Sequence, residues 1–597
     1  MPNNPDNKDT QSKIEDFAKL QIITREAELE AEVRFKEKLQ GIYTEAAQNK
    51  ENYSSNWRSY IDFLRGKQWP DRRPSHKISA ILNFLIENIE RKTALLTDTK
   101  PLPKVIARSD SAQNTADILN TILGMIFESS SFAQAVSETV ENAQVLGTGA
   151  LGTLYDPDTD AGRGGVSIVS YDPRAVYFDP LVRKSYLLSE GEYVIVEDVW
   201  SLEKARDIFP KRANMYQADA GLSRFVSQKQ EGFFASIKSK VFKPREDKLT
   251  TSEVPRVYVR EFWLRDRSKK SDSDTYRFHN ASRKVVMIGE VIADDGDNPY
   301  NDGQFPLDLY GWHTDFDSAW SWGDVELLKS PQELMNKIIA TVLENIALMS
   351  NAIWIGDQDA LTKEEWIRLN NAPGSYVKKR PGRELRRDPG VPLPNYVLEA
   401  LGMLETGSEK VTGMVDVMRG IRTGQVSSGV GIESLQMMAQ ALIRLRARAL
   451  EAVHERVGRK LISRVFQYYK PDKIFEVLRE TKDIDAKTIE PIVSELLKPL
   501  DKRKKDAWTD IAFSIEPWSS LGLAKTQRRI ESMRLYELKA IDDEALLNDL
   551  EYPHRNKVLE RIHSKREAEQ TQETVQSPGG VAKQFPNQSG GSPQGRF

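Results

Sequence analysis

The stretch that decides the fold is 330–469, which begins SPQELMNKIIATVLEN (330–345) and contains the string GIRTGQVSSGVG (420–431). Ser330 can cap a helix, Pro331 suits the first helical position, and Glu333 completes a capping box. Apolar side chains then recur at helical spacing along one stripe: Leu334, Met335, Ile338, Ile339, Val342, Leu343 and Ile346. The whole stretch predicts a helix, a basic insert, a second helix, a glycine-rich loop and a very long helix.

Basic residues gather in the insert between the first two predicted helices. They are Lys378, Lys379, Arg380, Arg383, Arg386 and Arg387, against only Glu384 and Asp388. A cluster of this kind between two rigid helices favours contact with phosphate groups or an acidic partner over an ordinary solvated hairpin. Apart from Tyr376 no aromatic residue is interleaved with the cluster, so stacking on single-stranded bases is not indicated.

The glycine-rich loop follows a helix, whereas loops that cradle phosphates follow a strand. We therefore expect 420–431 to be a flexible connection between two helix ends. The long helix predicted for 430–469 has more Arg and Lys than acidic residues, and a pair such as Glu455 with Arg459 offsets only part of that charge. Gly458 marks the weak point of this helix, where we expect any kink to lie.

Composition bounds the class of protein. A chain of 597 residues can bury a large core and should hold more than one domain or layer. A net charge of -3 excludes a globally basic nucleic-acid binder but leaves room for local basic patches. The chain has no cysteine, which excludes disulfides and thiolate chemistry, and its six scattered histidines lack metal-ligand spacing. The polar start is not a signal peptide, and no apolar run is long enough to suggest a transmembrane helix.

A coarse pass along the chain predicts a mainly helical α+β protein. The expected helices are 12–50, 56–70, 77–97, 112–128, 132–146, 201–209, 485–497, 525–538 and 542–549, with a short element at 473–479. The expected strands are 105–107, 148–155, 165–171, 192–199, 256–265, 275–279, 284–292 and 509–516. We expect disorder at 1–10 and 565–597, and a polar excursion at 215–250.

Several strings resemble enzyme or metal motifs but fail on context. GTGALG (147–152) matches a dinucleotide fingerprint, yet a helix precedes it and a strand follows, so a helix-to-strand turn is predicted. No P-loop string occurs, which argues against a nucleotide-dependent motor. DPDTDAG (156–162) lacks the terminal glutamate of a calcium loop and predicts a turn between strands. Asp315, Asp317 and Asp324 are the candidates for a magnesium nuclease site, but they are typical of a loop entering a helix.

The chain resembles the portal, or head-to-tail connector, family of tailed bacteriophages. The strings that carry the resemblance are GEVIADDGDNPYNDGQFPLDLYGW (289–312), SWGDVELLKSPQELMNKIIATVLEN (321–345), VTGMVDVMRGIRTGQVSSGVGIESLQMMAQALIRLRARALEAVHERVGRKLI (411–462) and IEPWSSLGLAKTQRRIESMRLYELKAIDDEALLNDL (515–550). The resemblance spans roughly Trp57 to Arg561 and rests on the combination of these strings in this order.

The resemblance implies a portal fold whose parts are arranged in a ring oligomer. The implied parts are an N-terminal helical arm (1–50), a wing (51–329), stem helix 1 (330–351), a clip (352–393), stem helix 2 (394–419), a channel loop (420–431), a long wing helix and return (432–510), crown-like helices (511–564) and a disordered tail (565–597). The implied DNA-channel residues are Arg419, Arg422, Gln425, Ser427 and Ser428. The implied partner-binding residues of the clip are the six basic residues of the insert.

The resemblance also implies a structural, non-enzymatic role without a cofactor. A ring of about twelve copies at one capsid vertex would conduct double-stranded DNA during packaging and ejection. Its partners would be the terminase large subunit, then the tail adaptor, together with the major capsid and scaffolding proteins, and no membrane. It would be assembled in the bacterial cytoplasm and end in the virion. The alternatives are a tail adaptor or collar ring, and a magnesium-dependent packaging nuclease.

Overall fold

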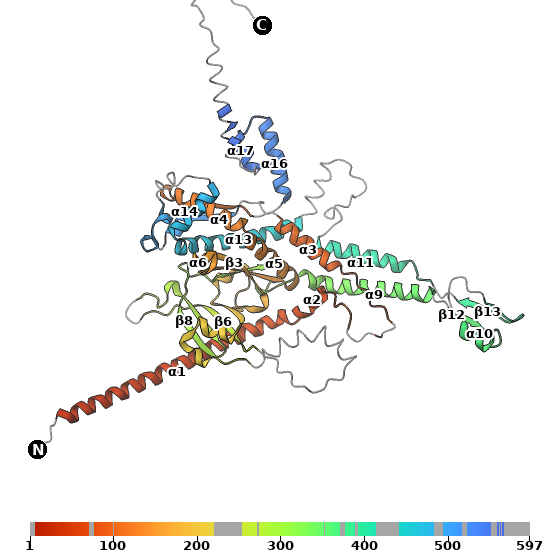
Figure 1. Cartoon of the computed structure of the whole chain (residues 1–597), viewed down its shortest axis with the longest axis horizontal. Coiled ribbons are helices and arrows are strands. Elements are labelled where there is room, and N and C mark those ends of the chain that lie inside the picture. Colours follow the sequence, from red (N-terminus) through yellow and green to blue (C-terminus); the bar gives the residue numbers. More distant parts are fainter. Residues whose placement is uncertain are drawn as a thin grey trace, which may run out of the picture. The chain divides into compact units, whose positions relative to one another are not determined.

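The computed structural model describes residues 6–70, 74, 77–98, 101–219, 254–270, 274–350, 353–369, 377–388, 392–413, 441–482, 494–504, 506–515 and 522–550, with a few positions between 558 and 565. The chain forms two compact units, Met1–Leu521 and Gly522–Phe597. Within the described residues the protein is mainly helical with several small sheets (Figure 1), which confirms the predicted α+β, mainly helical class. The strand at 511–515 belongs to the first unit, so the C-terminal helices begin after it.

The helices of the first unit are α1 (Asp6–Ser54), α2 (Trp57–Leu64), α3 (Phe84–Thr97), α4 (Gln113–Glu128), α5 (Ser130–Leu146), α6 (Thr159–Gly162), α7 (Leu202–Ile208), α9 (Asp324–Ser350), α10 (Lys363–Arg368), α11 (Tyr396–Thr412), α13 (Ala441–Tyr468) and α14 (Pro471–Lys482). The second unit contains α16 (Gly522–Glu537) and α17 (Asp543–Asp549). Of the helix predicted for 485–497, only a 3-10 turn, Glu495–Leu497, lies among the described residues.

The strands are β1 (Pro103–Ala107), β2 (Thr148–Asp156), β3 (Gly165–Tyr171), β4 (Val176–Phe178), β5 (Tyr193–Ser201), β6 (Arg256–Arg265), β7 (Ser282–Ile288), β8 (Val291–Asp297), β9 (Leu307–Gly311), β10 (His313–Thr314), β11 (Ser321–Trp322), β12 (Ile353–Gly356), β13 (Leu385–Asp388) and β14 (Ile511–Ile515). The single strand predicted for 284–292 was wrong, because a hairpin turn at Gly289, with φ of +59°, divides it into β7 and β8. The strand predicted for 275–279 was also wrong, since Tyr276 makes only an isolated bridge to Lys269.

A five-stranded antiparallel sheet, in the order β4-β5-β6-β7-β8, has helices on both faces. On one face α1 contributes Leu39 and Ala46, which are buried against Ile195 and Phe262. On the other face Leu202 and Ala205 of α7 pack with side chains of β6, β7 and β8. Both faces of this sheet are therefore covered by helices, and each face forms its own hydrophobic core; neither face is left to solvent.

A three-stranded sheet, in the order β3-β2-β9, packs against α5 and α13. The GTGALG string is the turn from α5 into β2, as predicted: Gly147 has φ of +91°, and a Cβ there would lie 1.9 Å from the Ser321 carbonyl oxygen. The loop of DPDTDAG is also the predicted turn, between β2 and β3. Both strings thus form turns and do not bind a cofactor or a metal ion in the way their motifs would suggest.

The long helix α13 is continuous through Gly458. A Cβ at Gly458 would lie 2.0 Å from the Phe513 ring, on β14. β14 pairs with β1 in antiparallel register, which ties the end of the first unit to its beginning. Gly458 is therefore a close-approach position for the β1–β14 sheet and not a break in the helix.

Helix α9 begins at Asp324, six residues before the predicted cap at Ser330, so the predicted start was wrong. Pro331 lies inside the helix, where it removes one backbone hydrogen bond. The earlier start is fixed by tertiary contacts, because the buried Asp324 carboxylate accepts hydrogen bonds from Lys92 Nζ at 2.6 Å and pairs with His313 Nε2 at 3.0 Å. Burial alone would raise the pKa of Asp324, but the bonds from His313 and Lys92 lower it to about 2.

The segment 77–83, which we call the strap, has no regular secondary structure, whereas the helix predicted there was expected to span 77–97. Polar side chains of α9 bind its backbone: Glu344 accepts from the Ile78 amide at 3.1 Å, Asn336 from Leu82 at 3.2 Å, and Gln332 from Phe84 at 3.2 Å. Gln332 also donates to the Leu82 carbonyl. These bonds satisfy backbone groups that a helix would pair internally, and they explain why Gln332 and Asn336 are buried.

Candidate channel, hairpin and tip surfaces

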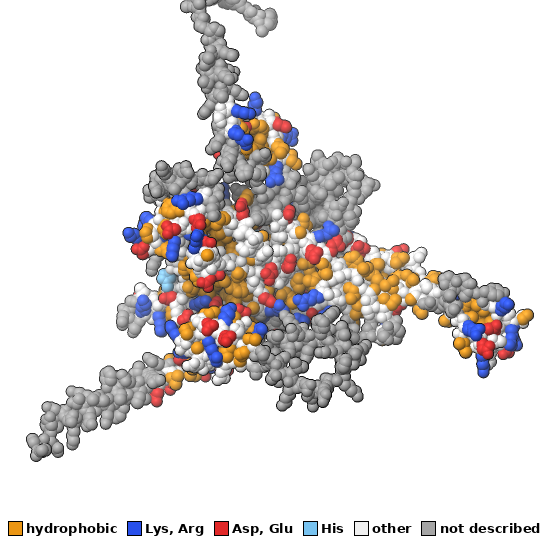
Figure 2. Space-filling model, in the orientation of Figure 1, with side chains coloured by type: hydrophobic (Ala, Val, Ile, Leu, Met, Phe, Trp, Pro, Cys, Tyr) orange, Lys and Arg blue, Asp and Glu red, His pale blue; other side chains and the backbone are white. Residues whose placement is uncertain are grey.

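Helices α9 and α11 form a hairpin, and the β12–β13 element lies between them in sequence (Figure 1). The hairpin exposes an apolar surface along both helices, in orange in Figure 2. Its members are Leu334, Leu343, Ile346, Leu348 and Met349 of α9 and Tyr396, Leu398, Met403 and Val411 of α11. Leu348 is 72% exposed and Met403 73% exposed. Exposed apolar side chains that gather along one element are typical of a protein interface.

The predicted apolar stripe of α9 is therefore only partly buried. Met335 is 3% exposed, whereas Leu334, its neighbour, is 45% exposed. Asn336 and Glu344, on another side of the helix, bind the strap. The helix thus has buried polar side chains that are satisfied within the chain and several apolar side chains that the described residues leave exposed.

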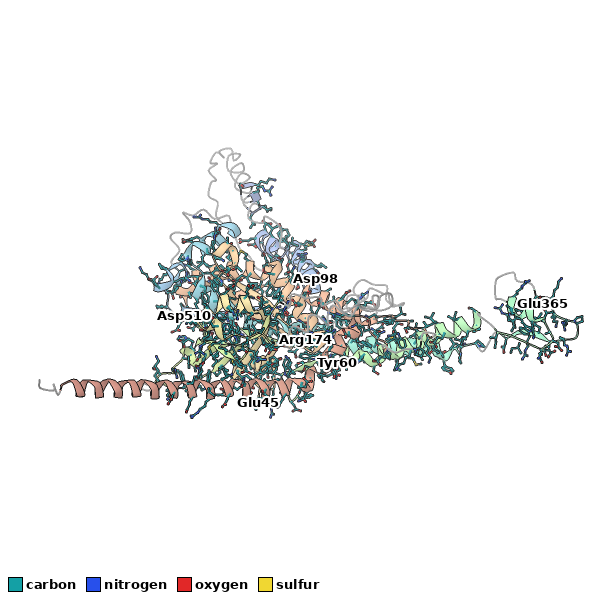
Figure 3. All side chains as sticks on the ribbon, turned by 60° about the horizontal axis from the view of Figure 1, so that its bottom comes forward. Glu45, Tyr60, Asp98, Arg174, Glu365 and Asp510 are labelled. Carbon is teal, nitrogen blue, oxygen red and sulfur yellow. The ribbon has the colours of Figure 1, made fainter. Side chains whose placement is uncertain are left out.

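The basic insert forms a compact element of β12, α10 and β13. Strand β13 pairs with β12 in antiparallel register, with Arg386 opposite Ile355 and Arg387 opposite Trp354. Thr362 and Glu365 form a capping box at the start of α10. The pKa of Glu365, labelled in Figure 3, is lowered by the backbone and side-chain hydrogen bonds from Thr362, with smaller contributions from Arg380 and Lys378.

All six basic residues of the insert are exposed. Arg383 contacts Asp359 at 3.4 Å and Arg387 donates to the Ser350 carbonyl at 3.2 Å. The other four, Lys378, Lys379, Arg380 and Arg386, form no ion pair with any residue that the structure describes. The first half of the element contains the acidic residues Asp357, Asp359, Glu364 and Glu365. The positive charge of the element is therefore concentrated in its second half.

The five candidates of the predicted channel loop, Arg419, Arg422, Gln425, Ser427 and Ser428, lie outside the described residues. The described part of α11 ends at Thr412, and Gly413 has the left-handed φ of +74° that ends many helices. Their role as DNA contacts stays a prediction.

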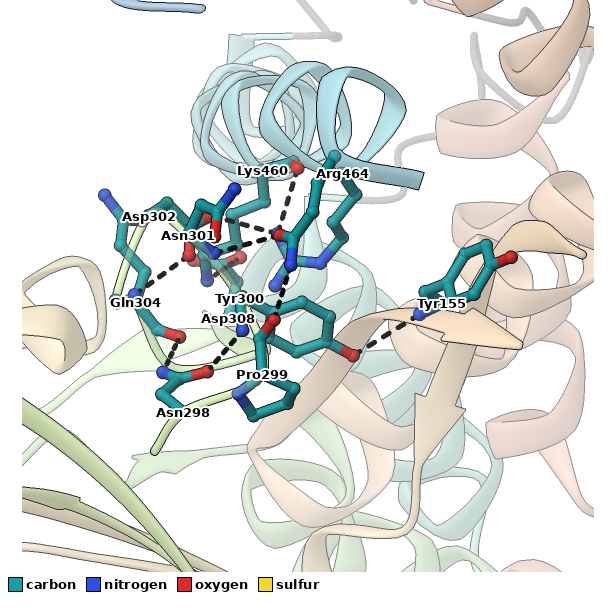
Figure 4. A network of polar contacts seen from close by, with 12 residues as sticks. Tyr155, Asn298, Pro299, Tyr300, Asn301, Asp302, Gln304, Asp308, Lys460 and Arg464 are labelled. Carbon is teal, nitrogen blue, oxygen red and sulfur yellow. Dashed lines mark hydrogen bonds and ion pairs between the residues drawn. The ribbon is translucent and has the colours of Figure 1, made fainter. Parts of the chain in front are cut away.

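The basic residues of α13 hold the three-stranded sheet and its neighbouring loop. Lys460 donates to Asp308 at 2.7 Å and Arg464 contacts Asp302 at 3.1 Å (Figure 4). Arg456 contacts the Asp308 carboxylate as well, at 3.1 Å. Burial lowers the pKa of Lys460, and the Asp308 carboxylate opposes that effect. The pair Glu455 with Arg459 forms as predicted, at 2.6 Å. Most of this charge is therefore internal and unavailable to a ligand.

A basic pocket that the sequence did not indicate lies where α2 and α9 meet. Its volume is about 580 Å³, and four lysines from distant segments line it: Lys67, Lys77, Lys329 and Lys337. Glu333 is the one carboxylate in its lining. Lys329 donates to Ser59 at 2.9 Å, and Lys67 lies 3.5 Å from Asp62. The sequence contains no sign of this pocket because more than 250 residues separate Lys67 and Lys77 from Lys329 and Lys337.

The three aspartates considered for a nuclease are not brought together as a metal site. Asp324 is occupied by Lys92 and His313, while the Asp315 side chain accepts from the Asp317 amide in a turn. Across the described residues no group of three or more His, Asp or Glu side chains could hold a metal ion. None of the described helices combines the length and apolar character needed to cross a membrane.

A family model of the phage P22-like portal protein matches residues 40–590, which is nearly the whole chain. The chain belongs to this family. The match includes the α9–α11 hairpin, the β12–β13 element and the long helix α13, and it confirms the resemblance seen in the sequence. No curated protein sequence matches the chain.

Proposed function

We propose that about twelve copies of this chain form the ring at one capsid vertex through which double-stranded DNA enters and leaves the phage head. The observation that carries the proposal is the apolar face of the α9–α11 hairpin, in a chain that belongs to the portal family. In this assignment the hairpin is the stem, and each stem covers the apolar face of its neighbour. Burial of that face would supply much of the assembly free energy.

The β12–β13 element is the clip in this proposal, and its basic residues bind the terminase large subunit and later the tail adaptor. Lys378, Lys379, Arg380 and Arg386 support this role because they are exposed and lack an ion-pair partner within the described part of the chain. Repetition by ring symmetry turns each such residue into a circle of charges, which suits successive partners that dock and leave.

DNA contacts in the channel should be weak, repeated and independent of sequence. Arg419 and Arg422 of the predicted channel loop remain the first candidates, with Gln425, Ser427 and Ser428. The pocket of Lys67, Lys77, Lys329 and Lys337 is a second candidate, since its four lysines outnumber the acidic residues Glu333, in its lining, and Asp62, which pairs with Lys67. Contacts to phosphate that exchange easily allow duplex DNA to slide, and the chain acts as a structural conduit rather than an enzyme.

The test is DNA packaging in phage heads assembled with a clip variant. The variant K378A/K379A/R386A/R387A should form rings like those of the wild type but reduce packaged DNA or tail attachment at least tenfold. The matched control K38A/K104A/K211A/K502A removes four exposed lysines elsewhere and should package normally. Normal packaging and tail attachment by the clip variant would overturn the clip assignment.

A further inference from the structure

A row of four side chains joins α3, β10, α9 and α13 where α9 begins. Lys92 Nζ donates to one oxygen of Asp324 at 2.6 Å, and His313 Nε2 lies 3.0 Å from the other oxygen. On the opposite side of the imidazole, Arg446 Nη2 lies 2.6 Å from His313 Nδ1. We call these four residues the clasp. Both ring nitrogens of its histidine are engaged, one by a residue of α9 and the other by a residue of α13.

The contacts of the clasp fix the charge state of His313. A guanidinium can only donate hydrogen bonds, so Nδ1 must accept from Arg446 and carries no proton. Burial alone would raise the pKa of Asp324, but the bonds from His313 and Lys92 lower it to about 2, so this carboxylate is ionised and can only accept. Nε2 must therefore carry the proton that it donates to Asp324. The histidine is neutral in this arrangement.

The clasp is sealed at one end and reachable by water in the middle. The side chains of Lys92 and Asp324 are 4% and 2% exposed, whereas that of His313 is 21% exposed. Tyr310 of β9 is a further titratable neighbour, and its hydroxyl donates to the Arg446 carbonyl at 3.2 Å. Burial raises the pKa of Tyr310, so this phenol stays neutral. With a neutral histidine the clasp already holds two cations against one anion.

A proton on His313 Nδ1 would break the α13 side of the clasp. Two nitrogens that lie 2.6 Å apart would then both be donors, and two cations would face each other, so Arg446 must move away. The contact with Asp324 would persist, because the imidazolium still donates through Nε2. The far part of α13 has its own anchor in the pair of Lys460 with Asp308. Release is therefore confined to the first described turns of α13.

We propose that the clasp is a pH-sensitive switch, which holds the first described turns of α13 to α9 while His313 is neutral and releases them when it is protonated. Histidine side chains change charge between about pH 5 and pH 8, so mild acidification acts on this switch. The released state accepts a proton that the held state refuses. Release is therefore favoured as pH falls, by about tenfold per pH unit where the histidine titrates. The clasp lies within one chain and depends neither on the ring nor on DNA.

Amide hydrogen exchange of the full chain, followed by mass spectrometry at about pH 7 and about pH 5, tests the switch. After correction for the pH dependence of intrinsic exchange, peptides that cover 441–450 should lose protection about tenfold or more at the lower pH. Peptides that cover 457–466 of the same helix should keep their protection. An equal loss in both sets of peptides would indicate unfolding of the whole helix, as protonation of the buried His454 would cause, and would overturn the switch.

Two variants test the residues of the clasp. H313Q cannot take up a proton, so its protection of 441–450 should no longer depend on pH. R446M removes the guanidinium that protonation displaces, and it should lose the pH dependence as well. The matched control H279Q replaces a histidine that is exposed on a 3-10 turn and should behave like the wild type.

Circular dichroism establishes that each variant folds, and R446M decides the question if H313Q does not fold. Wild-type protection of 441–450 that is the same at both pH values would overturn the switch. So would a wild-type pH dependence that persists in H313Q or in R446M, or one that is lost equally in H279Q.

Discussion

The interior around α13 and the α9–α11 hairpin use polar and apolar side chains in opposite ways. Around α13, even charged groups are buried and paired within one copy, as Lys460 and Arg464 are with Asp308 and Asp302. Along the hairpin, polar groups such as Asn336 are satisfied while Leu348 and Met403 face outward. The charged groups of the first region have partners within one chain, whereas the described residues leave apolar side chains of the second region exposed.

The two regions contribute differently to the free energy of folding. The α13 interior must depend on internal pairing, because a charge left alone there has no water to replace its partner. The exposed hairpin face contributes little to the stability of one copy, since its apolar groups meet water in both the folded and the unfolded chain. Substitutions should therefore separate folding from assembly, and they can be ranked by their expected effect on folding.

The largest effect is expected for Asp308→Asn. The substitution leaves Lys460 and Arg456 without their shared carboxylate, and breaking a buried pair in this way costs about 3–5 kcal/mol. Urea unfolding followed by tryptophan fluorescence should show a strong fall in the midpoint. As a control, Glu455→Gln removes an exposed i,i+4 pair with Arg459 and should change stability by less than about 0.5 kcal/mol. Equal effects of the two substitutions would contradict the account of the interior.

A smaller effect is expected for Gly458→Ala. The new Cβ would lie 2.0 Å from the Phe513 ring, so β14 must shift away from α13 at a cost of about 1–3 kcal/mol. The double variant with Phe513→Leu should recover part of the loss, because a smaller side chain gives the methyl room. A stabilised Gly458→Ala, as helix propensity alone would predict, would show that the contact does not constrain the helix.

These positions also show what the sequence could and could not reveal. Strands such as β5 and β6 were predictable because their apolar alternation is local, and the turns at Gly147 and Asp160 followed from their order in the chain. The start of α9 could not be predicted, because the capping signal at Ser330 is local, whereas the true start at Asp324 is fixed by contacts with Lys92 and His313. The helix predicted for the strap was wrong for the same reason. Its apolar residues indicated a helix, but its backbone groups bind side chains of α9. Pairings across 200 residues leave no local signal.

The next largest effect on the free energy of unfolding depends on pH. His454 is fully buried between Phe127 and Phe132, and burial lowers its pKa from 6.5 to about 3. The unfolded chain therefore takes up a proton that the folded chain refuses, so stability falls as pH drops below 6.5 toward 3. His454→Leu removes this dependence, and the stability difference between variant and wild type should grow by about 1.4 kcal/mol per pH unit in that window. A constant difference between pH 7 and pH 4.5 would contradict the buried, neutral histidine.

The smallest effect on folding is expected for the hairpin variant L348S/M403S. Both side chains are exposed in one copy, so the free energy of unfolding of the monomer should change by less than about 0.5 kcal/mol per site. Thermal unfolding at low protein concentration measures this. The pair L328S/M335S, which alters buried residues of the same helix, should instead destabilise the monomer strongly. A large monomer destabilisation by L348S/M403S would mean that the face is covered within one copy.

The most direct test of the central claim is particle imaging with mass determination on purified wild-type chain and on L348S/M403S. The account predicts closed rings of about a dozen copies with a central hole for the wild type. It predicts folded single copies for the variant, because its hairpin face no longer favours burial. Rings of the same size and yield from the variant would contradict the claim that this apolar face holds the copies together.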